Sequence, residues 1–171
     1  MVPADRAAWA LALYGGLRLG ELLALEWEAV DLDAGEFHVR RAWCTRTKQF
    51  TPPKTKAAIR TVPIVGELRR VLPEHRRFTG RRGGLVVRRE GGGVESGDAI
   101  AWRAEKAAKM TVLTMHEARH TYASLMILAR VPITALSRFL GHTSITVTVG
   151  WVRTPVPDGA RGGRRGLRCP L

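Results

Sequence analysis

The chain has 171 residues, of which 45% are hydrophobic, and this length and composition are typical of one folded domain with a sizeable core. Its 28 Lys and Arg residues outnumber its 15 Asp and Glu residues, and the resulting formal charge of +13 favours a polyanionic partner such as nucleic acid. Cys44 and Cys169 lack the spacing of a disulfide framework or a zinc site, and no apolar run is long enough to span a membrane, so we expect a cytoplasmic protein.

Hydrophobic periodicity and turn residues predict a mainly helical chain with a few short strands. In chain order we expect a helix over 7–13, a helix over 17–27, a strand over 36–43, a strand over 59–64, a helix over 67–77, a strand over 85–88, and helices over 98–109, 114–130 and 132–141. The Arg, Gly and Pro residues of 153–171 cannot bury a core, so we expect this tail to be disordered.

Proline, glycine and capping residues set several features of these elements. Pro63 lacks an N–H group and therefore predicts a strand at the edge of a sheet. Pro73 is expected to interrupt the helix that contains it. Thr114 and Glu117 have the spacing of a capping box at the start of a helix, and Gly141 is expected to end the last one.

Four short clusters contain the polar residues that are candidates for a functional site. They are GLRLGELLALEW with Arg18 and Glu21, PKTKAAIRTVPI with Lys54 and Lys56, HEARH with His116, Arg119 and His120, and LGH with His142. Each cluster alone has an ordinary explanation, such as a surface arginine, a solvated hairpin or a helix C-cap, and a GC-rich gene would also enrich arginine. The evidence for function therefore lies in the order and spacing of all four.

The HEARH cluster also fits the zinc pattern HExxH, in which two histidines four residues apart bind the metal and the glutamate acts as a base. On a helix, His116, Arg119 and His120 share one face, because they are spaced at i, i+3 and i+4. Arg119 would therefore place a fixed positive charge beside the zinc ligands, and no third ligand follows at the expected spacing. We keep a zinc hydrolase only as a remote alternative.

In order and spacing, the four clusters resemble the catalytic domain of the tyrosine recombinase (phage integrase) family over roughly residues 7–149. The resemblance implies an α+β fold that is mainly α-helical, with a small antiparallel three-stranded sheet. It implies one catalytic domain over 1–152 that is incomplete at its C-terminal end. It also implies double-stranded DNA as the partner and phosphodiester strand exchange as the reaction, with no metal and no cofactor.

The resemblance gives the candidate residues roles in phosphoryl transfer. Two arginines would clamp the non-bridging phosphate oxygens, because guanidinium groups bind them bidentately and stay charged. A hairpin lysine would protonate the leaving 5′-oxygen, one histidine would handle the proton of the nucleophile, and another would hydrogen-bond a phosphate oxygen. These roles fall on Arg18 and Arg119 (clamp), Lys54 with Lys56 as the alternative (acid), His116 (proton transfer) and His142 (phosphate contact), while Glu21 supports the first arginine and His120 is structural.

The nucleophile of that family is missing from this sequence. The two positions where the resemblance places the nucleophilic tyrosine hold Trp151 and Val152, and neither side chain can form a phosphoester. The two tyrosines, Tyr14 and Tyr122, are not placed to substitute for it, and Tyr122 is expected in the core. We hypothesise a frameshift near codon 149; the idea fails if the gene sequence opens no tyrosine-bearing reading frame there.

We therefore expect a DNA integration and site-specific recombination protein of a phage or mobile element, which binds duplex DNA and is catalytically defective. The alternative is a non-catalytic DNA-binding remnant of an integrase. The sequence has no counterpart of the separate N-terminal helical domain of that family, so we expect a fragment of an integrase gene. Because the family tetramer is joined through the C-terminal segment, which departs from the family here, we expect a monomer.

Overall fold

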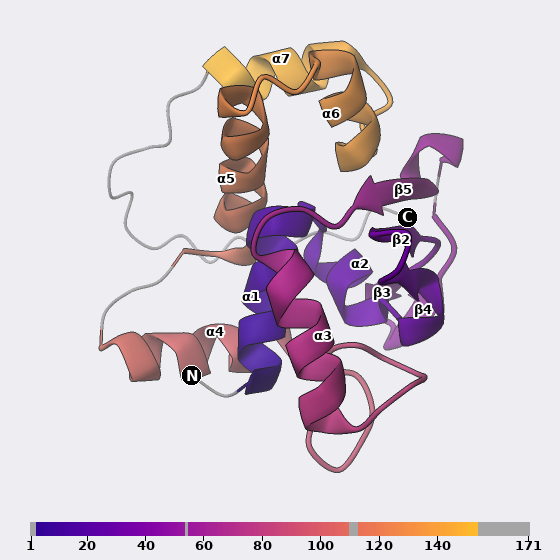
Figure 1. Cartoon of the computed structure of the whole chain (residues 1–171), viewed down its shortest axis with the longest axis vertical. Helices are drawn as coiled ribbons and strands as arrows, with labels where there is room; N and C mark the ends of the chain where they lie inside the picture. The colour runs from indigo at the N-terminus through magenta and orange to yellow at the C-terminus, as the bar shows by residue number, and fades with distance from the viewer. Residues whose placement is uncertain (1–2, 54, 110–112, 154–171) are drawn as a thin grey trace.

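The computed structural model describes residues 3–53, 55–109 and 113–153, with helix α1 packed among the other helices and the short strands to one side (Figure 1). In chain order the elements are α1 (Pro3–Gly15), α2 (Leu19–Ala24), η1 (Trp27–Ala29), β1 (Val30–Asp31), β2 (Glu36–Val39), β3 (Ala42–Cys44), β4 (Gln49–Thr51), η2 (Lys56–Ala58), β5 (Arg60–Pro63), α3 (Leu68–Thr79), α4 (Gly97–Ala108), α5 (Met115–Leu128), α6 (Ile133–Leu140) and α7 (Ile145–Arg153). The expected fold, mainly α-helical with small antiparallel sheets, is confirmed. No helix within the described ranges is long and apolar enough to cross a membrane.

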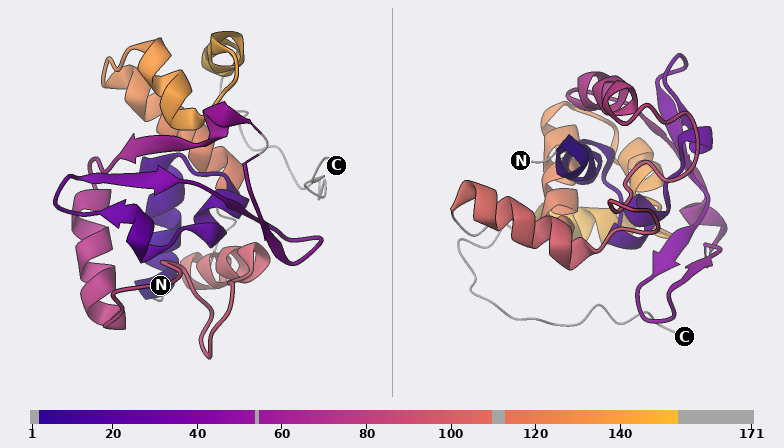
Figure 2. Two further views of the ribbon diagram at one scale, coloured as in Figure 1. Left: turned by 90° about the vertical axis from the view of Figure 1, so that its right-hand side faces the viewer. Right: turned by 90° about the horizontal axis from the view of Figure 1, so that it is seen from below.

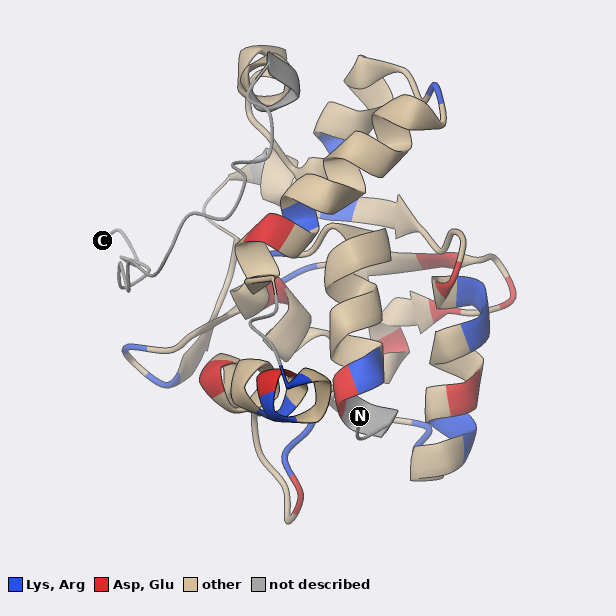
Figure 3. Ribbon diagram, turned by 90° about the vertical axis from the view of Figure 1, so that its left-hand side faces the viewer, with Lys and Arg blue, Asp and Glu red and all other residues tan. Residues whose placement is uncertain are grey.

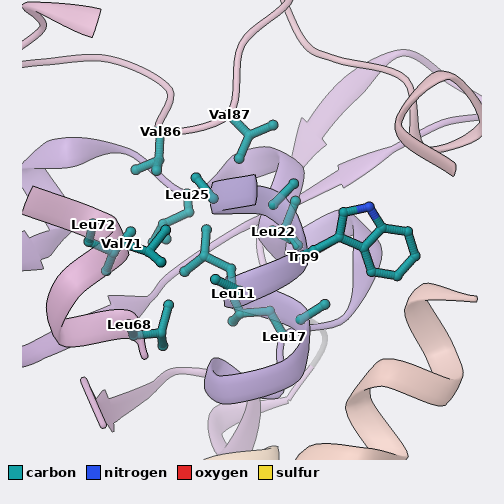
Figure 4. Close-up of a cluster of buried hydrophobic side chains, with 14 of the residues drawn as sticks. Trp9, Leu11, Leu17, Leu22, Leu25, Leu68, Val71, Leu72, Val86 and Val87 are labelled. Atoms are coloured by element: carbon teal, nitrogen blue, oxygen red, sulfur yellow. The ribbon is translucent and has the colours of Figure 1, made fainter. Parts of the chain in front are cut away.

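Helix α1 forms the axis of the main hydrophobic core, because small and apolar residues surround it on several sides. Ala8, Leu11 and Ala12 are fully buried, and the helix contacts α2, α3, α4 and α5. Leu17 and Leu22 continue the same core into the start of α2 (Figure 4). The beginning of α2 is thereby held against α1.

Strands β1, β2 and β5 form the three-stranded antiparallel sheet that the sequence predicts, in the order β1-β2-β5. In the central strand, Phe37 pairs with Val30 on one side and Val62 on the other. Because side chains alternate along a strand, Arg60 shares the buried face of β5 with Val62. The edge position expected for Pro63 is confirmed, since β5 is the last strand in the order.

The single strand expected over 36–43 is wrong: the segment forms two strands in two different sheets. The chain breaks at Arg40 and Arg41, and β3 then pairs with β4 in a separate two-stranded hairpin. The contacts of Arg41 explain the break. Its Nε donates to the carbonyl oxygen of Ala24 at 3.3 Å, and its guanidinium pairs with Glu26, so the chain turns toward the end of α2.

Two other local predictions are also wrong. Segment 85–88 is not a strand but makes isolated bridges at its two ends, because Val86 and Val87 are consecutive and both buried in the core. A half-buried strand would bury only every second side chain. Pro73 does not interrupt α3, which runs from Leu68 to Thr79 against α1, with buried Leu72 before the proline and buried His75 after it.

The predicted ends of α5 and α6 are confirmed. At the start of α5, the Thr114 hydroxyl accepts the N–H of Glu117 at 3.2 Å, and the Glu117 carboxylate accepts the N–H of Thr114 at 2.7 Å. Gly141 ends α6 in the left-handed conformation, with φ of 64°. The capping box fixes the first turn of α5, which carries the HEARH cluster.

Helices α5, α6 and α7 pack together at the top of Figure 1, and Figure 2 shows the same group from two other sides. Helices α5 and α6 share a small core of Tyr122, Ala123, Leu136 and Leu140. Tyr122 is fully buried, as expected. Helix α7 was not predicted, because ITVTV is rich in β-branched residues that favour strands. The tail expected from 153 onward lies, after Arg153, outside the described residues.

Candidate active site

Three arginines and one glutamate from distant parts of the chain meet beside the end of α6. Arg18 directly precedes α2, Glu21 lies within it, Arg60 begins β5 and Arg119 lies in α5. Arg18 Nη2 also donates to the carbonyl oxygen of Gly141, at 3.4 Å, across 123 residues of sequence. The fold therefore brings Arg18 and Glu21, which share one sequence motif, together with Arg119 of another.

Glu21 is the hub of this arginine cluster. Its Oε1 accepts hydrogen bonds from Arg18 Nη1 and Arg60 Nη1, each at 2.9 Å. Its Oε2 accepts the backbone N–H of Arg18 and Arg60 Nη2, each at 2.8 Å, and lies 3.7 Å from Arg119 Nη1. Burial alone would raise the pKa of Glu21, but the hydrogen bonds and charge of Arg60 and its neighbouring arginines outweigh it and lower the pKa to about 2. Glu21 is therefore ionised at neutral pH.

Arg60 is a site residue that the sequence analysis missed. It is 8% exposed, and besides its two bonds to Glu21 it donates from Nε to the carbonyl oxygen of Phe139 at 2.6 Å and from Nη1 to that of Ala58 at 3.2 Å. It thus joins β5 to α2 and to the end of α6. The sequence does contain a signal for Arg60. On a strand, Arg60 and Val62 lie on the same face, and a charged side chain on a buried face needs a partner.

Arg119 is the most enclosed arginine of the cluster, with 2% of its surface exposed. Nη1 donates to the carbonyl oxygen of Gly16 at 2.5 Å, and Nη2 donates to that of Leu140. Burial, and then the charge of Arg18, lowers the pKa of Arg119 to about 9, so the group stays charged at neutral pH. Gly16 has φ of 60°, and a Cβ on it would lie 2.3 Å from the ring of Tyr122. Only glycine lets this carbonyl reach Arg119.

His142 lies directly after α6, against Arg119. Arg119 Nη2 lies 3.4 Å from His142 Nε2, and His142 Nδ1 lies 2.9 Å from the hydroxyl of Thr148 on α7. Burial, followed by the charges of Arg119 and Arg18, lowers the pKa of His142 to about 4. The imidazole is therefore neutral at pH 7. Its ring thus lies between Arg119 of α5 and Thr148 of α7.

His116 and His120 form a pair on the first turns of α5. Their Nε2 atoms lie 3.1 Å apart, and His116 is exposed. Burial lowers the pKa of both rings, with a further contribution from Arg119 at His116 and from His116 at His120. His116 thus lies one turn from Arg119, near the arginine cluster, whereas His120 contacts His116.

The HExxH interpretation finds little support in this geometry. The glutamate of the pattern, Glu117, is held by the backbone N–H of Thr114 in the capping box, away from the role of a base. Within the described ranges, no group of three or more His, Cys, Asp or Glu side chains is placed to hold a metal ion.

Several predicted site positions cannot be located in space. Lys54 lies outside the described residues, and for Lys56 the structure describes only a backbone in η2. Trp151 and Val152 belong to α7, but their side chains also lie outside the described part. The acid and the position of the nucleophile therefore stay predictions.

The arginine cluster carries an excess of positive charge. Three guanidinium groups, those of Arg18, Arg60 and Arg119, face one carboxylate, that of Glu21, which leaves a surplus of two positive charges. The side chain of Arg18 is 46% exposed, so the otherwise buried cluster reaches solvent at this residue. Lys and Arg residues elsewhere are spread over several elements rather than gathered on one face of the view in Figure 3. The cluster is therefore a local concentration of positive charge.

Comparison with known proteins gives a family match over most of the chain. The profile of the phage integrase family matches residues 3–154. A tyrosine recombinase XerC-like protein of Caldanaerobacter subterraneus subsp. tengcongensis is 30% identical over 183 aligned residues, covering 89% of this chain and 46% of that protein. The prophage integrase IntR of Escherichia coli is 49% identical over 72 residues, covering 42% of this chain and 17% of that protein. The chain thus spans less than half the length of either relative.

Solved structures show the same fold. The XerA recombinase has a TM-score of 0.71 at 19% identity, covering 90% of this chain and 53% of that one. The Tn1549 transposon integrase, in complex with circular intermediate DNA, has a TM-score of 0.67 at 20% identity, covering 86% of this chain and 54% of that one.

Proposed function

Because this chain belongs to the phage integrase family, we propose that it binds duplex DNA and holds one backbone phosphate at the arginine cluster. The observation that carries the proposal is the surplus of two positive charges around Glu21, partly buried and opening to solvent at Arg18. A phosphodiester is an anion that guanidinium forks bind bidentately, and burial strengthens the attraction. DNA-bound integrases among its structural neighbours support the same partner.

In this proposal the residues act as the family resemblance implies. Arg18 and Arg119 clamp the non-bridging oxygens, and Glu21 keeps the two guanidiniums in place. His142 contacts a phosphate oxygen, and His116 lies where it can exchange a proton with a nucleophile. Lys54 supplies the proton to the leaving oxygen. The role of the chain in its genome is DNA integration or site-specific recombination by descent, as a cytoplasmic protein.

We further propose that the protein binds DNA without cutting it. Trp151 and Val152 occupy the positions of the nucleophile, and neither can form a phosphoester. The alternative of a non-catalytic remnant shares this binding behaviour and differs only in whether any covalent step survives. We also propose a monomer in solution.

The DNA-binding proposal is tested by titrating a duplex oligonucleotide at several salt concentrations. The wild-type protein should bind with an affinity that falls as salt rises, because each phosphate contact releases counterions. Arg18→Gln should weaken binding and reduce the slope of log affinity against log salt by about one. Arg82→Gln, which removes the same charge from an exposed residue in the loop after α3, is the matched control. Equal effects of the two variants, or no salt-dependent binding, would contradict the proposal.

A further inference from the structure

The ring of His142 lies between two partners whose chemistry fixes its proton. A guanidinium has only N–H donors, so Arg119 Nη2 must donate to His142 Nε2, at 3.4 Å. Nε2 is therefore the acceptor in this contact and carries no proton. A neutral imidazole carries its single proton on the other nitrogen, so Nδ1 donates to the hydroxyl oxygen of Thr148, at 2.9 Å.

This arrangement is the wrong one for holding a phosphate. Phosphate oxygens are acceptors, so His142 can hydrogen-bond one through Nε2 only when Nε2 carries a proton. Because Nδ1 already contacts Thr148, the ring must change its protonation pattern when the anion binds. Two routes exist: the ring gains a second proton, or it changes tautomer and stays neutral.

Thr148 makes the neutral route available. Its side chain is fully buried in α7, and within the described residues its hydroxyl makes no side-chain hydrogen bond except that to His142. A hydroxyl can accept or donate by rotating about its C–O bond, unlike a carboxylate or a carbonyl. The surroundings also favour a neutral ring, since burial and the nearby arginines lower the pKa of His142 to about 4.

We propose that Thr148 is a positioning residue that lets His142 change tautomer when a phosphate group binds at the proposed site. On binding, the Nδ1 proton leaves to solvent and Nε2 takes one from solvent, so the charge of the ring is unchanged. The Thr148 hydroxyl rotates and donates to Nδ1, Arg119 Nη2 turns from His142 to the phosphate, and Nε2–H donates to a phosphate oxygen. The inference rests on the proposed function, because it needs a phosphate at the arginine cluster.

The test is nuclear magnetic resonance of the full chain labelled with nitrogen-15, in which ring nitrogen shifts distinguish both neutral tautomers from the imidazolium. Spectra at pH 7 are recorded with and without inorganic phosphate, and His142→Gln identifies the signals. We expect the Nδ1–H form without phosphate and the Nε2–H form with it. Thr148→Val should bind phosphate about tenfold more weakly, because Nδ1 loses its partner. Thr148→Ser should stay within about twofold of the wild type, as the hydroxyl is kept.

The matched control is Thr146→Val, since Thr146 lies on the same helix but is exposed. It should leave the phosphate affinity and the tautomer of His142 unchanged. An Nε2–H ring before phosphate is added, an imidazolium after it, or a Thr148→Val protein that binds like the wild type overturns the inference. If Thr148→Val does not fold, the wild-type spectra and Thr148→Ser still decide. If the wild-type protein bound neither phosphate nor duplex DNA, the result would contradict the proposed function, and this inference would fail with it.

Discussion

At the scale of single residues, the arginine cluster depends on Glu21 for its shape. All of its carboxylate oxygens accept hydrogen bonds from arginine groups, and it is the one acidic member among three guanidiniums. Without this negative charge, Arg18, Arg60 and Arg119 would repel one another. The single carboxylate of Glu21 thus holds three guanidinium groups close together.

The pH dependence of stability follows from the pKa of Glu21. Its value in the folded protein is about 2, against an ordinary value of 4.5, so the ionised form stabilises the fold above about pH 4.5. That contribution, about 3 kcal/mol, is lost as the pH falls from 4.5 toward 2. Urea unfolding at a series of pH values should show this loss in the wild type and a shallower one in Glu21→Gln. Parallel curves for the two proteins would contradict the assignment.

Arg60 should be essential for stability although no motif marks it. Arg60→Met removes the partner of a buried carboxylate, and breaking such a pair costs about 3–5 kcal/mol in the free energy of unfolding. Arg70→Met is the control, because Arg70 pairs with Glu67 and Glu74 on the exposed face of α3 and should barely change the urea midpoint. If Arg60→Met were as stable as Arg70→Met, the ion pair between Arg60 and Glu21 would not be important for stability.

At the scale of elements, the site forms where the ends of α1, α5 and α6 meet. Arg119 reaches from α5 to the carbonyl oxygens of Gly16, after α1, and Leu140, in the last turn of α6. Arg60 reaches from β5 to the carbonyl oxygen of Phe139 in the same turn. Helix ends expose carbonyl groups without partners inside the helix, and here the arginines supply those partners. The same bonds that position the arginines therefore also hold the helices together.

Substitution of Gly16 tests this junction. Gly16 and Gly80 have nearly equal φ angles, 60° and 64°, but a Cβ at Gly16 would lie 2.3 Å from the ring of Tyr122, whereas nothing lies within 4 Å at Gly80. Gly80→Ala should cost about 1–2 kcal/mol for the left-handed backbone. Gly16→Ala should cost a further ~1–3 kcal/mol for the clash. Thermal or urea unfolding measures both, and equal losses would show that the close approach to Tyr122 is not tight.

Sequence patterns located the helices better than the strands. The capping box at Thr114 and the end of α6 at Gly141 are local signals, and the structure has both. The break between β2 and β3 depends on contacts of Arg41 with residues far back in the chain, so alternation alone could not reveal it. Helix α7 is held by packing against α5 and α6, which overrides the strand preference of its β-branched residues.

The site residues also divide into those that sequence motifs indicate and those that only the tertiary structure reveals. The family resemblance selected Arg18, Glu21, Arg119 and His142, and the fold brings these four together. Arg60 was missed because its importance comes from a bond across 39 residues of sequence to Glu21, which only the tertiary structure displays.

At the scale of the whole molecule, the chain has the integrase fold and a positively charged cluster, and the two positions that we propose for the nucleophile hold Trp151 and Val152. The formal charge of +13 would favour non-specific attraction to DNA but would not create a local binding site, since basic residues lie on many elements (Figure 3). The local concentration of positive charge comes from the buried arginine cluster around Glu21. We therefore propose that this protein has kept DNA binding and lost DNA cutting.

We propose a phosphate-binding site without its nucleophile, and a nicked suicide duplex, which traps covalent protein–DNA intermediates, gives the decisive measurement. An intact integrase on its own site serves as the positive control, and binding of this chain to the same duplex is measured in parallel by gel shift. We predict a salt-sensitive complex and no covalent adduct on a denaturing gel. An adduct formed by this chain would contradict the account, because it would require a nucleophile that neither Trp151 nor Val152 can supply.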